Sequence, residues 1–272
     1  MIRLIASDID GTLFTPQGTI TPRTVSAIRR AQAKGAVFAM CTGRFPENAL
    51  MIAQKYGLRC PVIGLNGAQI HDGSRVLHRA YLPLDLSKAI RDALERCGAV
   101  YYMFCEGFVA MRRAGHLHHS QREFGDAITR QFGVRYESGE QAVYDAPVDK
   151  VFKYFVYEDD ESCPLSVAEV PLRALPALDI TRSSAVNFEV MYEGVSKASG
   201  LAAFAKALGV PREAIMALGD YDNDSDMLRY AGLGVAMGNA VADAKAAADA
   251  VTLDNAHDGV AAAIERYVLG EG

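Results

Sequence analysis

The chain has 272 residues, 50% of them hydrophobic and 22% charged, and its formal net charge is −5. This length and composition are typical of a globular protein with one large or two modest domains. No stretch concentrates Lys and Arg, and no apolar run approaches the roughly 20 residues that span a bilayer, so we expect neither nucleic acid nor membrane as a partner. The five cysteines form no Cys-x-x-Cys pair. Since the N-terminus also lacks a signal-peptide pattern, we expect free thiols in a cytoplasmic protein.

Strand and helix signals alternate in the first part of the chain. Apolar strand-like runs occupy residues 2–8, 36–42 and 61–67, and helical patterns occupy residues 21–35 and 46–57. The first helix is predicted to have Thr21 as its N-cap, Pro22 at its first position and Gly35 at its end. The middle of the chain differs, with a predicted helix over 84–98 and aromatic, β-rich segments at 100–113, 150–157 and 186–192. This change predicts an inserted α+β domain.

The alternation of strands and helices returns after residue 190. Helices are predicted over 196–209, 224–232, from Ala240 onward and near 258–268, and strands over 214–220, 233–237 and 250–253. Short apolar strands separated by helices predict a parallel sheet covered on both faces. We therefore expect an α/β fold, in which residues 1–82 and 191–272 form a Rossmann-like, doubly wound parallel sheet core. A second domain at 83–190, of α+β class, is inserted into it.

Polar motifs stand where three of the predicted strands end. Asp8-Ile9-Asp10-Gly11-Thr12 follows the first strand, Thr42-Gly43-Arg44 follows the second, and Gly219-Asp220-Tyr221-Asp222-Asn223-Asp224 follows the strand at 214–220. In open parallel sheets, ligands bind outside the carboxyl ends of the strands. If these strands are neighbours, the three loops form a cluster of carboxylates beside a hydroxyl and turn amides.

Such a cluster favours particular chemistry. Neighbouring carboxylates repel one another unless a cation lies between them, and all-oxygen ligation favours Mg²⁺ over zinc. The Thr42 hydroxyl, turn amides and Lys197, at the start of the helix at 196–209, are groups that bind phosphate oxygens. By its spacing alone Lys197 fits a solvated lysine better. A nucleophilic carboxylate, Mg²⁺, a phosphate site and a second carboxylate together fit phosphoryl transfer through an aspartyl-phosphate.

These residues resemble the motifs of a known family. DIDGT at 8–12, Thr42 in CTGR, Lys197 in GVSKASGL and LGDYDNDSDML at 218–228 resemble the four motifs of the haloacid dehalogenase (HAD) superfamily. The pattern is most similar to its Cof-type sugar-phosphate phosphatases, which carry a large α+β cap between the second and third motifs. NGA at 66–68, GVAMGNA at 234–240 and DGVAAAI at 258–264 also resemble that branch. The resemblance implies that the inserted α+β domain at 83–190 is such a cap, which would choose the substrate. In the cap, the resemblance rests on insertion point and size only.

The resemblance implies a role for each matching residue. Asp8 would be the nucleophile, and Asp10 would protonate the leaving oxygen and later activate water. Mg²⁺ would be held by the Asp8 carboxylate, the Asp10 backbone carbonyl and Asp220, with Asp224 supporting it indirectly or through a water. Thr42, Gly43, Lys197 and Asn223 would bind the transferring phosphoryl group.

The resemblance also implies a substrate class. The expected activity is Mg²⁺-dependent hydrolysis of a small phosphorylated metabolite, with sugar phosphates the leading class. Candidate substrate contacts are Arg44, Asn187 and Glu189. Arg44 fits a structural role equally well, and Asn187 and Glu189, which share one face of a strand, fit an ordinary cap surface. The sequence carries no signal for the oligomeric state.

Two other functions use similar residues. A phosphomutase would hold its phosphoenzyme long enough to return the phosphoryl group, and the motifs do not distinguish it from a phosphatase. A phosphoacceptor signalling module also uses clustered aspartates, a Thr and a Lys. Such a module is about half this length and places its acidic pair and its acceptor on different strands, whereas here both aspartates share one loop.

Overall fold

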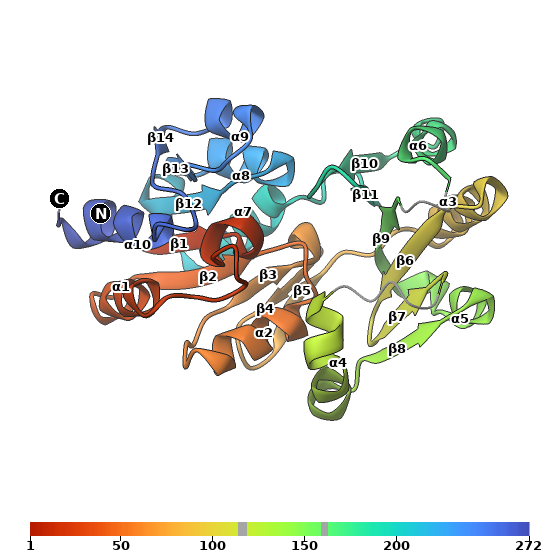
Figure 1. Cartoon of the computed structure of the whole chain (residues 1–272), viewed down its shortest axis with the longest axis horizontal. Helices are drawn as coiled ribbons and strands as arrows, with labels where there is room; N and C mark the ends of the chain where they lie inside the picture. Colours follow the sequence, from red (N-terminus) through yellow and green to blue (C-terminus); the bar gives the residue numbers. More distant parts are fainter. Residues whose placement is uncertain (114–118, 159–162, 272) are drawn as a thin grey trace. The chain divides into compact units, whose positions relative to one another are not determined.

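The computed structural model describes residues 1–113, 119–158 and 163–271 (Figure 1). The chain divides into two compact units, which we call the core unit (Met1–His78 with Ser196–Gly272) and the cap unit (Arg79–Val195). The borders predicted from the sequence, at 82/83 and 190/191, lie a few residues inside the cap unit. Within the described residues, no helix is both long enough and apolar enough to cross a membrane.

The core unit is built on one sheet with the strand order β14-β13-β12-β1-β2-β3-β4-β5. Its strands are β1 (Leu4–Ser7), β2 (Val37–Cys41), β3 (Val62–Gly64), β4 (Gln69–His71), β5 (Val76–Arg79), β12 (Ile215–Gly219), β13 (Leu233–Ala236) and β14 (Ala250–Val251). The strands from β14 to β3 are all parallel, and β4 pairs antiparallel with β3. All residues of β1 and β12 are buried, as expected for strands covered on both faces.

Helices cover both faces of this sheet (Figure 1). They are α1 (Pro22–Ala33), α2 (Pro46–Lys55), α7 (Lys197–Leu208), α8 (Ser225–Tyr230), α9 (Ala242–Ala247) and α10 (Gly259–Ile264). The chain runs outward from β1 through α1 to β2 and through α2 to β3, and in the opposite direction from β12 through α8 to β13 and through α9 to β14. Because such crossovers are right-handed, the two halves place their helices on opposite faces. The doubly wound α/β fold predicted from the sequence is confirmed.

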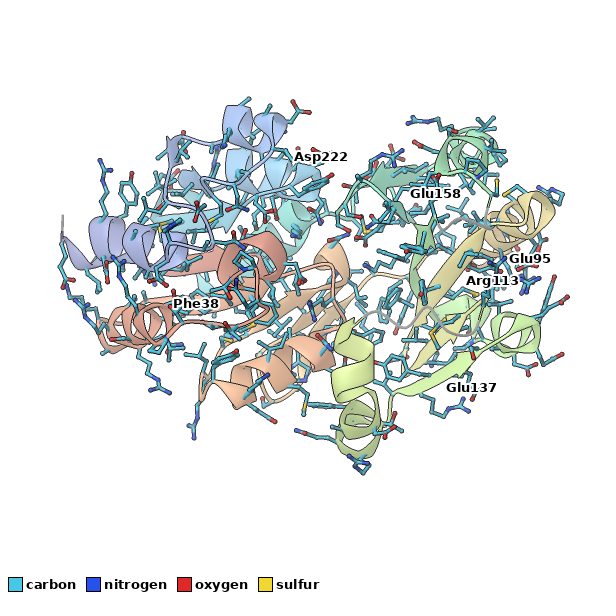
Figure 2. The ribbon with its side chains drawn as sticks, in the orientation of Figure 1. Phe38, Glu95, Arg113, Glu137, Glu158 and Asp222 are labelled. Carbon is cyan, nitrogen blue, oxygen red and sulfur yellow. The ribbon has the colours of Figure 1, made fainter. Side chains whose placement is uncertain are left out.

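Local signals in the sequence explain where these elements begin and end. The Thr21 side chain accepts a hydrogen bond from the Thr24 amide and caps α1, as predicted, and Pro22 opens that helix. Phe38 in β2 is fully buried in the sheet (Figure 2). The strand expected over 61–67 is shorter in the structure: β3 ends at Gly64, and the chain turns sharply over Leu65–Gly67.

The cap unit has a sheet of its own, with the strand order β10-β11-β9-β6-β7-β8. Its elements are α3 (Leu84–Cys97), β6 (Val100–Cys105), β7 (Phe108–Met111), α4 (His119–Phe132), β8 (Arg135–Ser138), α5 (Glu140–Asp145), β9 (Val151–Tyr157), α6 (Leu165–Arg173), β10 (Leu178–Thr181) and β11 (Asn187–Tyr192). Its strand pairs are antiparallel except β7 with β8. The predicted α+β character is therefore confirmed.

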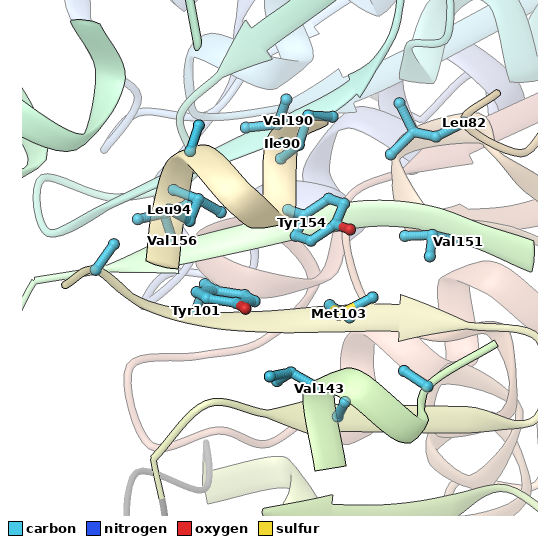
Figure 3. Close-up of a cluster of buried hydrophobic side chains, with 14 of the residues drawn as sticks. Leu82, Ile90, Leu94, Tyr101, Met103, Val143, Val151, Tyr154, Val156 and Val190 are labelled. Carbon is cyan, nitrogen blue, oxygen red and sulfur yellow. The ribbon is translucent and has the colours of Figure 1, made fainter. Parts of the chain in front are cut away.

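One apolar cluster joins this sheet to its helices (Figure 3). Ile90 and Leu94 of α3 pack against Tyr101 of β6 and Tyr154 of β9, all four of them fully buried. The Tyr154 hydroxyl donates to the Ser87 carbonyl at 2.8 Å, so the aromatic ring is buried without an unpaired polar atom. The cap unit thus has an apolar core separate from that of the core unit, as a domain does.

Candidate active site

The three motif loops meet at one edge of the core sheet. Asp8 directly follows β1, Thr42 follows β2 and Asp220 follows β12, and these strands are neighbours in the order β12-β1-β2. The direction of strand winding reverses between β1 and β12. Such a switch point, outside the carboxyl ends of the strands, is the usual ligand site of an open α/β sheet.

A buried lysine lies between two aspartates of different loops. The Lys197 ammonium donates to Asp8 Oδ1 at 2.7 Å and to Asp224 Oδ1 at 2.6 Å, and the Lys197 and Asp224 side chains are each 1% exposed. Asp224 Oδ2 accepts hydrogen bonds from the amides of Asp220 and Tyr221, at 3.0 and 3.1 Å. Both oxygens of Asp224 are therefore used to hold Lys197 and the loop that carries Asp220.

Asp220 is fixed from the loop that carries Asp8. The Thr12 hydroxyl donates to Asp220 Oδ1 at 2.7 Å. Gly11, just before it, has a positive φ of 82°, and a Cβ added there would lie only 2.2 Å from Asp220 Oδ2. Only glycine allows both this backbone conformation and this close approach. The glycine of the DIDGT motif is therefore required by the Asp220 carboxylate.

Burial and the charges of neighbouring groups shift the pKa values of Asp8, Asp220 and Lys197. Burial raises the pKa of the Asp8 carboxyl well above its usual range; Lys197 opposes this rise, and Asp224 and Asp220 add to it. Burial and the Asp224 charge raise the pKa of Asp220 to about 7, although the hydrogen bond from Thr12 lowers it. Burial acts to lower the pKa of Lys197, but the carboxylates of Asp224 and Asp8 raise it above its usual value. Strongly perturbed groups gathered in this way are typical of functional sites.

The three carboxylates could hold a metal ion. One oxygen each of Asp8, Asp220 and Asp224 lies within 4.8 Å of the others. Three carboxylates and one ammonium carry a formal charge of −3 + 1 = −2, which a divalent cation would balance. The ligand atoms are all oxygen, and no sulfur or imidazole belongs to this group, so the donor set suits Mg²⁺ and not zinc.

Asp10 lies apart from that cluster and pairs with Arg44. The Arg44 guanidinium donates from Nε and Nη2 to the two oxygens of Asp10, each at 2.6 Å, and from Nη1 to Asn48 Oδ1 at 3.0 Å. The Asp10 side chain is 53% exposed and the Arg44 side chain is 14% exposed. Arg44, a candidate substrate contact by sequence, thus orients the carboxylate of the predicted acid and base.

Thr42 and Asn223 belong to the same end of the sheet. The Thr42 hydroxyl accepts a hydrogen bond from the Arg44 amide at 3.1 Å, and its side chain is buried. Gly43 lies between them in the loop after β2. Asn223 Nδ2 donates to Asn66 Oδ1 at 3.3 Å. The fourth predicted phosphate ligand, Lys197, contacts Asp8 as described above.

The cap candidates have partners within the cap unit. Asn187, in β11, accepts hydrogen bonds from the Ser183 amide and hydroxyl at 3.2 Å. Glu189, two residues further, is 1% exposed and forms an ion pair with the Lys153 ammonium. Both side chains are buried in the cap unit, and their role as substrate contacts stays a prediction.

Several residues that support the site have no role predicted from the sequence. Besides Thr12 and Asn66 they include Asn239, which donates to the Gly11 carbonyl at 2.8 Å, and Asn255, which donates to the Phe14 carbonyl at 2.8 Å. The Asn255 amide also donates to Asn239 Oδ1 at 3.0 Å. Asn66 and Asn239 lie in NGA and GVAMGNA, two of the segments that carry the family resemblance. Their partners lie far away in the sequence, so the motif did not reveal what they bind.

Comparison with known proteins agrees with this geometry. The model of the haloacid dehalogenase-like hydrolases matches residues 5–264. Two relatives from Bacillus subtilis, YitU and YcsE, are both named 5-amino-6-(5-phospho-D-ribitylamino)uracil phosphatase. YitU is 32% identical, and the alignment covers 97% of each chain. YcsE is 33% identical, and the alignment covers 98% of this chain and 96% of the relative.

Solved structures give the same result. A haloacid dehalogenase-like hydrolase from B. subtilis superimposes with a TM-score of 0.84 at 28% identity, covering 98% of this chain and all of its own. A HAD subclass IIB sugar phosphatase superimposes with a TM-score of 0.80 at 27% identity, covering 97% and 98% of the two chains. The chain therefore belongs to the haloacid dehalogenase-like hydrolases, and to the phosphatases among them.

Proposed function

We propose that this enzyme is a Mg²⁺-dependent phosphatase that hydrolyses a small phosphorylated metabolite through an aspartyl-phosphate on Asp8. The observation that carries the proposal is the contact between the Asp8 carboxylate and the buried Lys197 ammonium, at 2.7 Å, beside Asp220 and Asp224. A carboxylate can act as a nucleophile toward phosphorus when its charge and that of the phosphoryl group are balanced. Lys197 supplies one of those positive charges.

The reaction divides into two displacements at phosphorus. In the first, an oxygen of Asp8 forms a bond to phosphorus while the ester bond breaks, and Asp10 gives its proton to the leaving oxygen. In the second, Asp10 takes a proton from a water, which attacks the aspartyl-phosphate, releases inorganic phosphate and restores Asp8. The half-exposed Asp10 carboxylate that the first step leaves, oriented by Arg44, is then the base for the second step.

Asp8 and Asp220 are the carboxylates that we propose to hold Mg²⁺ directly, together with the Asp10 backbone carbonyl. Asp224 would support the ion indirectly, because both of its oxygens already accept hydrogen bonds from Lys197 and from backbone amides. When bound, Mg²⁺ supplies positive charge to the phosphoryl oxygens and to the attacking carboxylate.

The phosphoryl group itself would be bound by Thr42, Gly43, Lys197 and Asn223. Hydroxyl, amide and ammonium donors are available there from the loops after β2 and β12 and from the first turn of α7. Donors from three separate elements can surround a phosphoryl group, which has three equatorial oxygens in its transition state. Such donors are effective because the fold holds them in place before the substrate arrives.

The substrate class that we propose is a phosphorylated sugar or sugar-derived chain. Two relatives are named for a phosphate on a ribityl chain, and a structural neighbour is a sugar phosphatase. The cap unit would choose among such substrates, with Asn187 and Glu189 as the first residues to test. A panel of phosphorylated sugars and polyols, assayed for phosphate release, addresses this part of the proposal.

The central test is the substitution Asp8→Asn, which keeps the size of the side chain and removes the nucleophile. We expect turnover of p-nitrophenyl phosphate with Mg²⁺ to be abolished while the circular dichroism spectrum is unchanged. Asp226→Asn is the matched control, because it makes the same change two residues after Asp224 at a side chain that is 71% exposed. Near-normal turnover in Asp8→Asn would refute the proposal. Release of free phosphate in step with the alcohol separates a phosphatase from a phosphomutase.

A further inference from the structure

We propose that Asn66 is a positioning residue that orients Asn223 and so prepares the phosphate site before substrate binds. The inference rests on the proposed function, since it takes Asn223 to be a ligand of the phosphoryl group. It concerns the loop Leu65–Gly67, which we call the LNG loop and which follows β3 directly. The loop combines an unusual backbone, contacts with two other site elements and a buried amide side chain.

The backbone of the LNG loop is left-handed at three successive residues. The φ angles are 51° at Leu65, 51° at Asn66 and 96° at Gly67. Left-handed conformation costs roughly 1–2 kcal/mol per residue for most side chains, although Asn tolerates it better than Leu. Leu65 and Asn66 are 0% and 1% exposed, so the surrounding structure holds this conformation in place. Backbone strain that is maintained in this way is often found at functional sites.

Contacts join the LNG loop to two elements that carry site residues. The amide of Leu65 donates to the Arg44 carbonyl at 2.9 Å, and the amide of Asn66 donates to the Thr42 carbonyl at 3.0 Å. On its other side the loop packs on the start of α7, where a Cβ added to Gly67 would lie 2.1 Å from the Ser196 carbonyl oxygen. The loop after β2 and the helix that begins with Lys197 are therefore held against the same three residues.

The Asn66 side chain reaches a third element. Its Oδ1 accepts the hydrogen bond from Asn223 Nδ2 at 3.3 Å. An amide group has two donor protons and one acceptor oxygen. When one N–H of Asn223 is used for Asn66, the orientation of the whole Asn223 amide is set, including its second N–H. Asn66 therefore acts on the phosphate site through Asn223 and not by touching substrate.

The substitution Asn66→Gly separates this side-chain role from the backbone role of the loop. Glycine adopts positive φ readily, so this variant keeps the left-handed turn and removes the side chain that accepts the hydrogen bond from Asn223. Asn66→Ala loses the same bond and also strains the turn, so it is expected to be the less stable of the two variants. The difference between the unfolding free energies of the two variants in urea measures the cost of the left-handed backbone at this position, independently of activity.

A double-mutant cycle with Asn223→Ala then tests the mechanism. We expect Asn66→Gly to lower kcat/KM by about tenfold, the size of one neutral hydrogen bond, and to weaken inhibition by inorganic phosphate by a similar factor. In the Asn223→Ala background we expect Asn66→Gly to change kcat/KM by less than about twofold. A loss of equal size in both backgrounds, no loss in either, or full activity in Asn223→Ala would overturn the inference.

The outcomes also distinguish this inference from the proposed function. If Asp8→Asn keeps its turnover, the proposed phosphatase mechanism fails. If Asp8→Asn is inactive and Asn66→Gly is equally harmful with and without Asn223, the mechanism stands and only the positioning role fails.

Discussion

Replacing Lys197 by Met removes the ammonium that lies between Asp8 and Asp224 and changes the size of the side chain little. The ammonium is 2.7 Å from one carboxylate and 2.6 Å from the other, and its side chain is 1% exposed. The two carboxylates would remain buried and lose their common partner. We therefore expect Lys197→Met to lower the free energy of unfolding, even though methionine is more hydrophobic than lysine.

The expected size of the effect follows from the burial of the group. Removing one partner of a buried ion pair typically costs about 3–5 kcal/mol, and Lys197 has two such partners. Lys206 lies in the last turn of the same helix and is exposed. Lys206→Met is thus a matched control, which loses only the favourable interaction of a cation with the helix C-terminus, about 0.3–1 kcal/mol.

Urea unfolding followed by far-ultraviolet circular dichroism, with EDTA present, measures both variants. The double variant Lys197→Met/Asp8→Asn should recover part of the lost stability, because it removes one of the two unpaired charges. If Lys197→Met shifts the unfolding midpoint no more than Lys206→Met does, then the ion pairs are not what balances the buried carboxylates. The charge argument for the site would then be wrong.

Three further predictions concern the core unit. EDTA should abolish turnover, and excess Mg²⁺ should restore it. At one hundred times its Kd, Mg²⁺ should also raise the unfolding free energy by about 2.7 kcal/mol. A urea unfolding midpoint that does not change with Mg²⁺ would contradict the metal site. Gly11→Ala should cost about 1–3 kcal/mol from its positive φ and, because its Cβ would collide with Asp220, most of the activity. Gly18→Ala shares the positive φ but its Cβ meets no atom within 4 Å, so this control should remain active. Burial lowers the pKa of His71, so the unfolded chain binds more protons at this side chain near pH 6 and the contribution of His71 to stability falls with decreasing pH, opposite in sign to the contributions of Asp8 and Asp220, whose pKa values are raised. Urea titrations should show that the unfolding free energy of the native protein falls relative to that of His71→Asn as the pH decreases, but not relative to that of the exposed control His78→Asn.

The sequence predicted the sheet and the convergence of the loops because both depend on local patterns. Apolar runs that end in polar motifs predict buried parallel strands, and one topological rule then brings their carboxyl ends together. Asp8, Lys197, Asp220 and Asp224 were grouped on this basis and the family resemblance, and the structure places them in contact or close to one another. Local patterns predict the position of Asp8 and Asp220 because each directly follows its strand, whereas Lys197 opens a helix and was assigned by the resemblance.

The sequence could not predict the contacts that hold those motifs in place. Thr12 donates to Asp220 across 208 positions of the chain, and Asn223 donates to Asn66 across 157. No spacing rule reports such contacts. The left-handed turn at Leu65 was also missed, because LNG continues an apolar strand-like run and leucine rarely adopts positive φ. Tertiary contacts, and not the local preference of this segment, determine where β3 ends.

The charges of the site connect its stability to its function. Three buried carboxylates and one lysine leave a formal charge of −2, and burial and mutual repulsion raise the pKa of Asp8 and Asp220. Both effects cost folding free energy, since a charged carboxylate is more stable in water and away from other carboxylates. A cation that balances the charge removes much of this cost, so its binding free energy includes the repulsion it relieves. The features that destabilise this edge of the sheet are therefore the ones that favour a divalent ion.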